Sequence, residues 1–223
     1  MYGIVKNHKD FLLINKHPGV GFHKDGETEG LVEVIKKERG INELYTVHRL
    51  DKMTSGLLLF AKTRASAREL SHQFRNRQIE KFYLAVSDRC PRKKQGLIKG
   101  DMGRARRGAW KLLRTQENPA ITRFFSSSMG DGLRLFLLNP HTGKTHQLRV
   151  AMKSIGSPIS GDLVYHKKET GNKRPDRGYL HSYALRFHLK GQVYEFIHKP
   201  DIGVYFTNAA FLRVLKELLI YTD

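Results

Sequence analysis

The 223-residue sequence has a single cysteine, Cys90, and no apolar stretch approaching the roughly 18 residues that cross a bilayer. One cysteine cannot form a disulfide within the chain, which favours a reducing compartment. The eleven histidines include no His-Glu-x-x-His pattern, and no cysteine pair is present, so we expect no metal. Residues 1–7 lack both an apolar signal core and an Arg-rich presequence. These absences predict a soluble protein in the cytoplasm.

Acidic residues are few relative to basic ones. The chain has 40 Lys and Arg against 21 Asp and Glu, a formal net charge of +19. Such a surplus requires either a well-solvated surface or a polyanionic partner. We favour nucleic acid, because the basic residues cluster in an excursion, residues 91–118, and in a loop, residues 166–178. Contacts with an RNA backbone are expected from Arg104, Arg106, Arg107, Lys167 and Lys168. The alternative is that the charged run from Arg92 to Arg114 is only a solvated loop.

The apolar pattern predicts an α+β fold with a mainly antiparallel sheet flanked by helices and basic loops. Strands are expected at residues 11–16, 57–61, 81–86, 120–125, 133–138, 145–150, 183–189 and 193–197. Helices are expected at residues 31–39, 66–76 and 209–219. Ser66 and Glu69 would form a capping box, and Thr207 or Asn208 would cap the last helix. Without an internal repeat or a linker, residues 1–223 are expected to form one domain, with 91–118 as a hairpin or mobile loop.

The most informative segment is His-Arg-Leu-Asp-Lys-Met-Thr-Ser-Gly-Leu, residues 48–57. It places the Asp51 carboxylate beside a guanidinium on a polar loop that enters an apolar strand, and such loops commonly hold reactive groups. The same aspartate is also suited to capping a turn through its side chain. A second polar run, residues 138–150, ends in Arg149, whose planar fork can pair with a carboxylate and lower its pKa.

These segments resemble, in order, the motifs of RNA pseudouridine synthases of the RluA-like family. Residues 11–19 are similar to the first motif, 48–57 to the second and 142–149 to the third. Lys81-Phe82-Tyr83 resembles the family's Lys-x-Tyr, and residues 155–165 and 180–182 continue the likeness. The resemblance therefore covers nearly the whole chain. It implies the family's fold, with an RNA-binding cleft.

The resemblance also implies roles for individual residues. Asp51 would be the nucleophile and Arg149 the residue that orients it, with Tyr83 stacking on the target uracil. Arg49 would fill the gap left by the flipped uridine, and Leu148 would pack against the base. Further substrate contacts are expected from His48, Lys81, Lys144, Thr145 and His146. Of the histidines, His48, His146 and His181 are interpreted as hydrogen-bonded orienting groups rather than acids or bases.

The implied reaction is isomerisation of uridine to pseudouridine within a structured tRNA or rRNA. A carboxylate nucleophile is sufficient for it, so no cofactor is expected. We expect a monomeric, stand-alone catalytic domain without the S4-type RNA-binding domain of many relatives. One alternative is a non-catalytic RNA-binding or RNA-folding protein on the same scaffold. Another is an RNA hydrolase in which Asp51 works with a histidine base, which would release uracil or cleaved strands.

Overall fold

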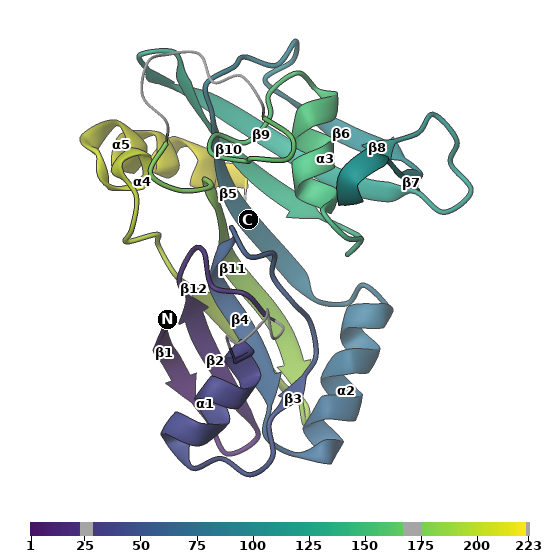
Figure 1. Ribbon diagram of the computed structural model, residues 1–223, viewed down its shortest axis with the longest axis vertical. Helices are drawn as coiled ribbons and strands as arrows, with labels where there is room; N and C mark the ends of the chain where they lie inside the picture. Colours follow the sequence, from purple (N-terminus) through teal and green to yellow (C-terminus); the bar gives the residue numbers. More distant parts are fainter. Residues whose placement is uncertain (23–28, 167–174, 222–223) are drawn as a thin grey trace. The chain divides into compact units, whose positions relative to one another are not determined.

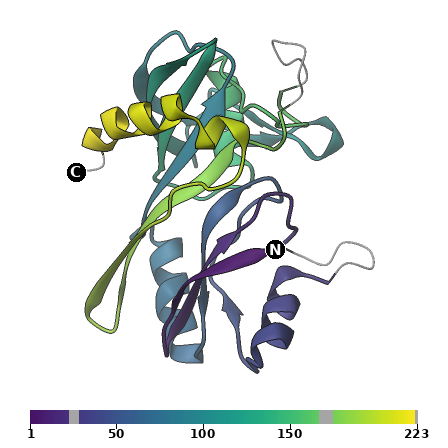
Figure 2. The same ribbon diagram turned by 90° about the vertical axis from the view of Figure 1, so that its left-hand side faces the viewer.

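A computed structural model describes residues 1–22, 29–166 and 175–221 (Figures 1 and 2). The chain divides into two compact units. The first unit contains residues 1–80 and 182–199, and the second contains residues 81–181 and 200–223. Across the described residues, no helix combines the length and the apolar character that a membrane span requires. The expectation of a single domain over residues 1–223 stays a prediction.

The first unit is a sheet with two helices. Its strand order is β1, β2, β4, β11, with β12 paired to β11 and the short β3 paired to β4. The bounds are β1 (Tyr2–Asn7), β2 (Phe11–Lys16), β3 (Tyr45–Thr46), β4 (Ser55–Ala61), β11 (Leu180–Leu189), β12 (Gln192–Ile197), α1 (Leu31–Arg39) and α2 (Arg64–Arg75). Every residue of β2 and β4 is buried, which explains their continuous apolar runs.

The second unit has its own run of strands, in the order β5, β10, β9, β6, and each neighbouring pair is antiparallel. A separate two-stranded ribbon, β7 with β8, is also antiparallel. The bounds are β5 (Glu80–Ser87), β6 (Gln95–Gly100), β7 (Met102–Arg104), β8 (Trp110–Leu112), β9 (Ala120–Gly130), β10 (Leu133–Pro140), α3 (Gln147–Ser154), α4 (Val204–Thr207) and α5 (Ala209–Leu218). Two short 3₁₀ turns complete it, η1 (Arg106–Gly108) and η2 (Leu219–Tyr221).

The expected α+β class with a mainly antiparallel sheet is confirmed. The helix at residues 31–39 has the expected bounds, and α5 is capped by Asn208, whose Oδ1 accepts a hydrogen bond from the Phe211 amide at 2.8 Å. The capping box at Ser66 and Glu69 is wrong. Helix α2 begins earlier and is capped by Thr63, whose Oγ1 accepts from the Ser66 amide at 3.2 Å. Glu69 instead accepts a hydrogen bond from the Lys190 amide.

The strand expected at residues 145–150 is also wrong, because this segment enters helix α3. The Gln147 side chain closes the turn before the helix: its Oε1 accepts from the Thr142 hydroxyl at 2.7 Å and from the Lys144 amide at 3.0 Å. Leu148, Ala151 and Met152 are then buried at helical spacing. A short apolar run after a polar one fits the period of a strand as well as that of a helix. Here the turn closed by Gln147 directs the chain into a helix.

The basic excursion contains the expected hairpin. Residues 95–100 form β6 at the edge of the sheet, and β7 and β8 pair from Met102 with Leu112 to Arg104 with Trp110. Asp101 fixes its base, because its carboxylate accepts from the amides of Glu117 and Asn118 at 3.1 and 2.9 Å. A hydrogen bond from the Thr115 side chain, with these amides, lowers the pKa of Asp101. The excursion therefore includes a two-stranded ribbon, β7 with β8.

Candidate active site

Asp51 lies on a short loop that leads into β4. The loop closes on itself, because the Thr54 amide donates to the Asp51 carbonyl at 3.0 Å. Leu50 is buried and anchors the loop, Arg49 is exposed, and Asp51 is half-buried. Strand β4 begins at once and is buried throughout. The carboxylate is thus presented from a tight turn on a rigid base, as the sequence predicts.

His48 attaches this loop to helix α2 and strand β4. Its ring stacks on Phe74 of α2, with centroids 4.4 Å apart and planes 19° from parallel. Its Nε2 accepts the Leu59 amide hydrogen at 2.9 Å, so this nitrogen is unprotonated and a neutral ring carries its proton on Nδ1. These contacts fit the interpretation of His48 as an orienting group. A contact with substrate stays a prediction.

A fully buried lysine joins the Asp51 loop to the turn after β2. The Lys16 ammonium donates to the carbonyls of His17, Val20 and Lys52 at 3.0, 2.9 and 3.2 Å. The Gly19 amide also donates to the Lys52 carbonyl, at 2.8 Å. No role for Lys16 was expected from the sequence. Its signal was a lysine that ends a mostly apolar strand directly before a His-Pro-Gly turn.

Gly56 allows β4 to approach β11 very closely. Its φ is +100°, and a Cβ at this position would lie 2.3 Å from the Ser182 carbonyl oxygen. Both the backbone conformation and the space therefore require glycine. The glycine of the Asp51 segment consequently fixes the strand that supports the loop.

Lys81 and Tyr83 are two residues apart on β5, so they lie on the same face of the strand, and both are buried. Burial lowers the pKa of Lys81 to about 8. The Lys81 carbonyl accepts from the Asn139 side-chain amide on the neighbouring β10 at 3.1 Å. The expected contacts of these two side chains with substrate stay predictions.

The turn before α3 is tied to β9. Gln147 Nε2 donates to the Ile121 carbonyl and to the Thr122 hydroxyl, both at 3.0 Å, and the Ile121 amide donates to the Thr142 hydroxyl at 2.9 Å. Lys144 donates from its ammonium to the Asn118 carbonyl at the base of the excursion. Gln147 therefore ties the turn that leads into the helix carrying Leu148 and Arg149 to strand β9.

Arg149 is buried and forms a bidentate ion pair with Asp162. Its Nε and Nη2 donate to the two carboxylate oxygens at 2.7 and 2.9 Å. Asp162 is fully buried, and its Oδ1 also accepts from the amides of Val164 and Tyr165 at 2.9 and 3.1 Å. The planar fork of Arg149 thus binds a carboxylate, as its chemistry predicts. That carboxylate belongs to Asp162, which was not expected from the sequence to be the partner. The expected pairing of Arg149 with Asp51 stays a prediction.

The charged tip of the β7–β8 hairpin is open to solvent. Arg104, Arg106 and Arg107 are all exposed, and the Arg104 guanidinium lies 5.6 Å from the centroid of the Trp110 ring. This exposure fits the expected contact with an RNA backbone. The other two residues expected to contact the backbone, Lys167 and Lys168, lie outside the described residues.

One arginine of the expected basic loop at residues 166–178 is not on the surface. Arg177 is buried, and its guanidinium donates to the carbonyls of Gly178, Ile202 and Leu180 at 3.1, 3.0 and 3.2 Å. Burial lowers its pKa to about 10. Arg177 therefore organises the interior of the second unit and adds no charge to an outer surface. His166 is buried as well, with Nε2 2.5 Å from the Asp88 carboxylate.

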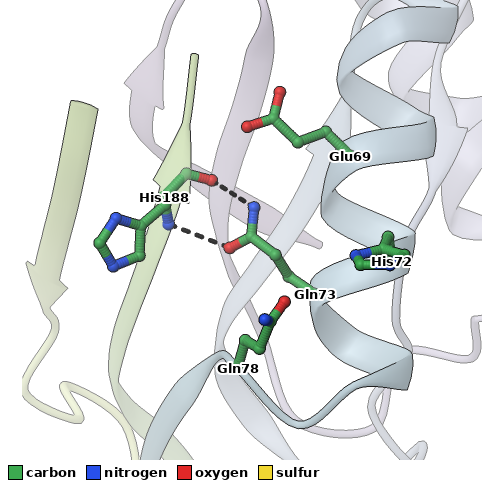
Figure 3. A pocket seen from close by; sticks show the side chains of 5 residues that line it. All are labelled: Glu69, His72, Gln73, Gln78 and His188. Carbon is green, nitrogen blue, oxygen red and sulfur yellow. Dashed lines mark hydrogen bonds between the residues drawn. The ribbon is translucent and has the colours of Figure 1, made fainter. Parts of the chain in front are cut away.

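A groove of about 410 Å³ lies in the first unit between α2 and β11 (Figure 3). It is lined by Glu69, His72, Gln73, Gln78 and His188, of which only Glu69 was named from the sequence, as a capping residue. The Gln73 amide bonds to both main-chain groups of His188, which is a structural role. Within the described ranges, no three His, Cys, Asp or Glu side chains gather in a group that could hold a metal ion.

Comparison with known proteins places these observations in a family. The family model for RNA pseudouridylate synthase matches residues 10–154. An uncharacterized RNA pseudouridine synthase from Haemophilus influenzae is 54% identical over 218 residues, which cover 98% of this chain and 95% of the relative. The ribosomal large subunit pseudouridine synthase C of Pasteurella multocida is 33% identical over 189 residues, covering 79% of this chain and 57% of the relative.

A solved structure extends the likeness to the fold. Human RNA pseudouridylate synthase domain containing 1 matches with a TM-score of 0.76 and 27% identity. The match covers 98% of this chain and 94% of the human chain. Both units of the present chain are therefore included in the likeness.

Proposed function

The chain belongs to the RNA pseudouridylate synthase family, and we propose that it isomerises uridine in structured tRNA or rRNA with the Asp51 carboxylate as nucleophile. As a member, it is an RNA pseudouridine synthase, an isomerase that acts on uridine in RNA. The observation that carries the proposal is the placement of Asp51. This carboxylate is half-buried on a turn closed by Thr54, directly before a wholly buried strand.

The reaction needs a nucleophile and a base that has left its stack. The N1–C1′ bond of uridine breaks, the uracil turns, and a C5–C1′ bond forms, while C5 loses a proton and N1 gains one. No atom is gained or lost overall. In this proposal an Asp51 carboxylate oxygen bonds C1′ as the N1–C1′ bond breaks, and the carboxylate leaves again when C5 bonds C1′. Extruding the base from a helix costs a few kcal/mol, and stacking on an aromatic side chain returns about 1–3 kcal/mol.

The remaining residues of the site are proposed to serve this carboxylate and the base. Arg149 orients Asp51 through a charge-assisted hydrogen bond, made beside the ion pair that its Nε and Nη2 form with Asp162. Tyr83 provides the stacking platform, Leu148 packs against the base, and Arg49 fills the gap left by the uridine. The rigid settings of Arg149, between Asp162 and the Tyr165 ring, and of Tyr83, on buried β5, support these roles.

Grip on the RNA is proposed to come from the exposed arginines of the β7–β8 hairpin, because the release of counterions from phosphates favours such contacts. The Pasteurella relative is named for the large ribosomal subunit, and this chain spans 57% of its length. An rRNA or tRNA stem-loop, reached in the cytoplasm, is the substrate class that we propose for this chain. A uridine in a loop is the cheapest to unstack.

The nucleophile is tested with Asp51→Asn and Asp51→Ala. The substrate is RNA that carries tritium at C5 of uridine, either transcribed in vitro or isolated from cells that lack the gene. Bond formation at C5 releases this tritium, so the released label measures the rate of the reaction. Each variant is expected to lose at least about a thousandfold in rate, as nucleophile removal does in other enzymes. The affinity for RNA, measured by filter binding, should change by less than about threefold.

Asp131→Asn is the matched control, because it makes the same chemical change at an exposed turn and should leave the rate unchanged. Turnover by Asp51→Asn near the wild-type rate would refute the role of Asp51. The target is found by carbodiimide-based mapping of pseudouridine in tRNA and rRNA from cells with and without the gene. A site that returns with the wild-type gene and not with Asp51→Ala names both the substrate and the nucleophile.

A further inference from the structure

The Tyr165 phenol lies where three parts of the second unit meet. Its ring is buried, and its hydroxyl oxygen accepts the Trp110 amide hydrogen at 2.8 Å. The same oxygen lies 2.9 Å from Nδ1 of His146. Because a phenol both accepts and donates hydrogen bonds, its oxygen can accept from the Trp110 amide while its O–H donates to the His146 imidazole. One hydroxyl group thus joins strand β8 to the residue before α3.

The first end of this connection is the basic hairpin. Trp110 begins β8 and pairs with Arg104, whose guanidinium lies over the indole ring at 5.6 Å. The exposed turn between the two strands carries Arg106 and Arg107. The Trp110 amide, which belongs to the same ribbon as these arginines, is hydrogen-bonded to Tyr165.

The other end is the entrance to α3. His146 adopts a left-handed conformation with φ of 57°, which few residues other than glycine adopt and which persists only when surrounding contacts hold it. The next residues are Gln147, Leu148 and Arg149, so the setting of His146 determines the direction of the helix that carries the arginine.

Tyr165 also contacts Arg149 itself. The Arg149 guanidinium lies 5.0 Å from the centroid of the Tyr165 ring, and the Lys153 ammonium lies 5.7 Å from it. Asp162 binds the Arg149 fork and accepts the Tyr165 amide, so one turn holds both side chains. The Tyr165 hydroxyl therefore contacts the hairpin and His146, while the Tyr165 ring contacts the Arg149 guanidinium.

We propose that Tyr165 is a positioning residue that couples the basic hairpin to Arg149, so that RNA bound at the hairpin sets the arginine for the reaction. This inference rests on the proposed function, in which the hairpin contacts RNA and Arg149 orients the nucleophile. The coupling runs through the hydroxyl, from the Trp110 amide to His146, and through the ring to the guanidinium.

Tyr165→Phe removes the hydroxyl and keeps the ring. We expect kcat at saturating RNA to fall about tenfold, which corresponds to the loss of one or two neutral hydrogen bonds. The Kd for RNA should stay within about threefold, because the hairpin arginines remain. Trp110, the only tryptophan of the chain, reports hairpin contact through its fluorescence, which should still change when RNA is added. Tyr194→Phe, which removes an exposed hydroxyl bonded to Gln192, is the matched control.

A double-mutant cycle separates coupling from mere structural support. The triple variant Arg104→Gln, Arg106→Gln, Arg107→Gln should raise Kd, flatten its salt dependence and lower kcat. In the Tyr165→Phe background the triple variant should still raise Kd but cause no further loss of kcat. Removing three charges from α2, with Arg64→Gln, Arg68→Gln and Arg75→Gln, controls for net charge.

Additive losses of kcat, an unchanged kcat in Tyr165→Phe, or a lower melting temperature as the only effect would each overturn the coupling. If Tyr165→Phe fails to fold, His146→Gly breaks the same connection from the other end while accepting the left-handed backbone. It should then show the same non-additivity with the triple variant. A triple variant with unchanged Kd and kcat would refute the hairpin as an RNA contact. The Asp51→Asn experiment tests the nucleophile independently of all these results.

Discussion

Each unit has a buried cation beside residues that the proposed reaction uses, and the two cations are held differently. Lys16, in the first unit, donates to three main-chain carbonyls around the Asp51 loop. Arg149, in the second unit, is held by a carboxylate through two parallel hydrogen bonds. Both side chains are almost excluded from solvent.

The difference shows what each unit has to fix. Carbonyls belong to the backbone, so Lys16 determines the path of the two turns rather than the direction of any side chain on them. A carboxylate fixes the guanidinium in one orientation, so Asp162 determines where the Arg149 side chain points. Removing one partner of a buried ion pair also leaves an uncompensated charge, which makes the second arrangement the more sensitive.

The largest effect is expected from Asp162→Asn. The substitution removes the negative charge but keeps the size of the side chain, so the Arg149 guanidinium remains buried beside a neutral amide. The free energy of unfolding should fall by about 3–5 kcal/mol, as for other broken buried pairs. Urea unfolding of the variant and of Asp131→Asn, the exposed control, measures this. A loss equal to that of the control would show that Arg149 does not depend on Asp162.

Lys81 gives a second, pH-dependent test, because burial lowers its pKa to about 8 while the unfolded chain keeps the usual value near 10.5. Between pH 8 and 10.5 the unfolded state holds a proton that the folded state has released, so the stability of the wild type rises with pH in this window. Below pH 8 both states are protonated and the full cost of burial remains.

The Lys81→Met variant should therefore be more stable than wild type by about 3 kcal/mol below pH 8, and this advantage should vanish by about pH 10.5. Urea unfolding of both proteins across this range gives the difference. Lys99→Met, at an exposed position of β6, should show a difference that does not vary with pH. An equally constant difference for Lys81→Met would mean that burial does not perturb this lysine.

The smallest of the three effects is expected from Lys16→Met. Methionine fills similar space but leaves the carbonyls of His17, Val20 and Lys52 without this donor, at a cost of about 2 kcal/mol. Lys62→Met is the control, because that ammonium bonds to Asn7 and His8 at a more exposed place and should cost less than about 0.5 kcal/mol. Thermal unfolding of the two variants ranks them. Equal losses would mean that the three carbonyls gain nothing particular from Lys16.

Much of the fold follows from local sequence signals. Helices α1 and α5 were predicted because apolar spacing and end signals agree, and the buried strands because their runs are continuous. Helix α3 was predicted as a strand because its decisive contacts come from Gln147 to β9, about 25 residues earlier. Its short apolar run contains no signal that separates the two periods.

In the candidate site, too, local sequence signals were predictive and contacts between distant residues were not. Asp51 and Arg149 were singled out from residue type and resemblance, whereas Asp162 and Lys16 act through contacts that only folding brings about. Arg177 falls within residues 166–178, which were expected to form a basic loop because so many of these residues are charged. Its three carbonyl partners come from the folded interior, and composition alone does not distinguish a buried arginine from an exposed one.

The bonds of Lys16 also have a consequence for the order in which the chain folds. Its partner at Lys52 is 36 residues away, and the Gly19 amide reaches the same carbonyl. Because each turn is bonded to the other, we expect both to acquire their native shape together when this segment closes. We also expect their amides to exchange with solvent as one cooperative unit, since opening the turn after β2 breaks the bonds that hold the Asp51 loop.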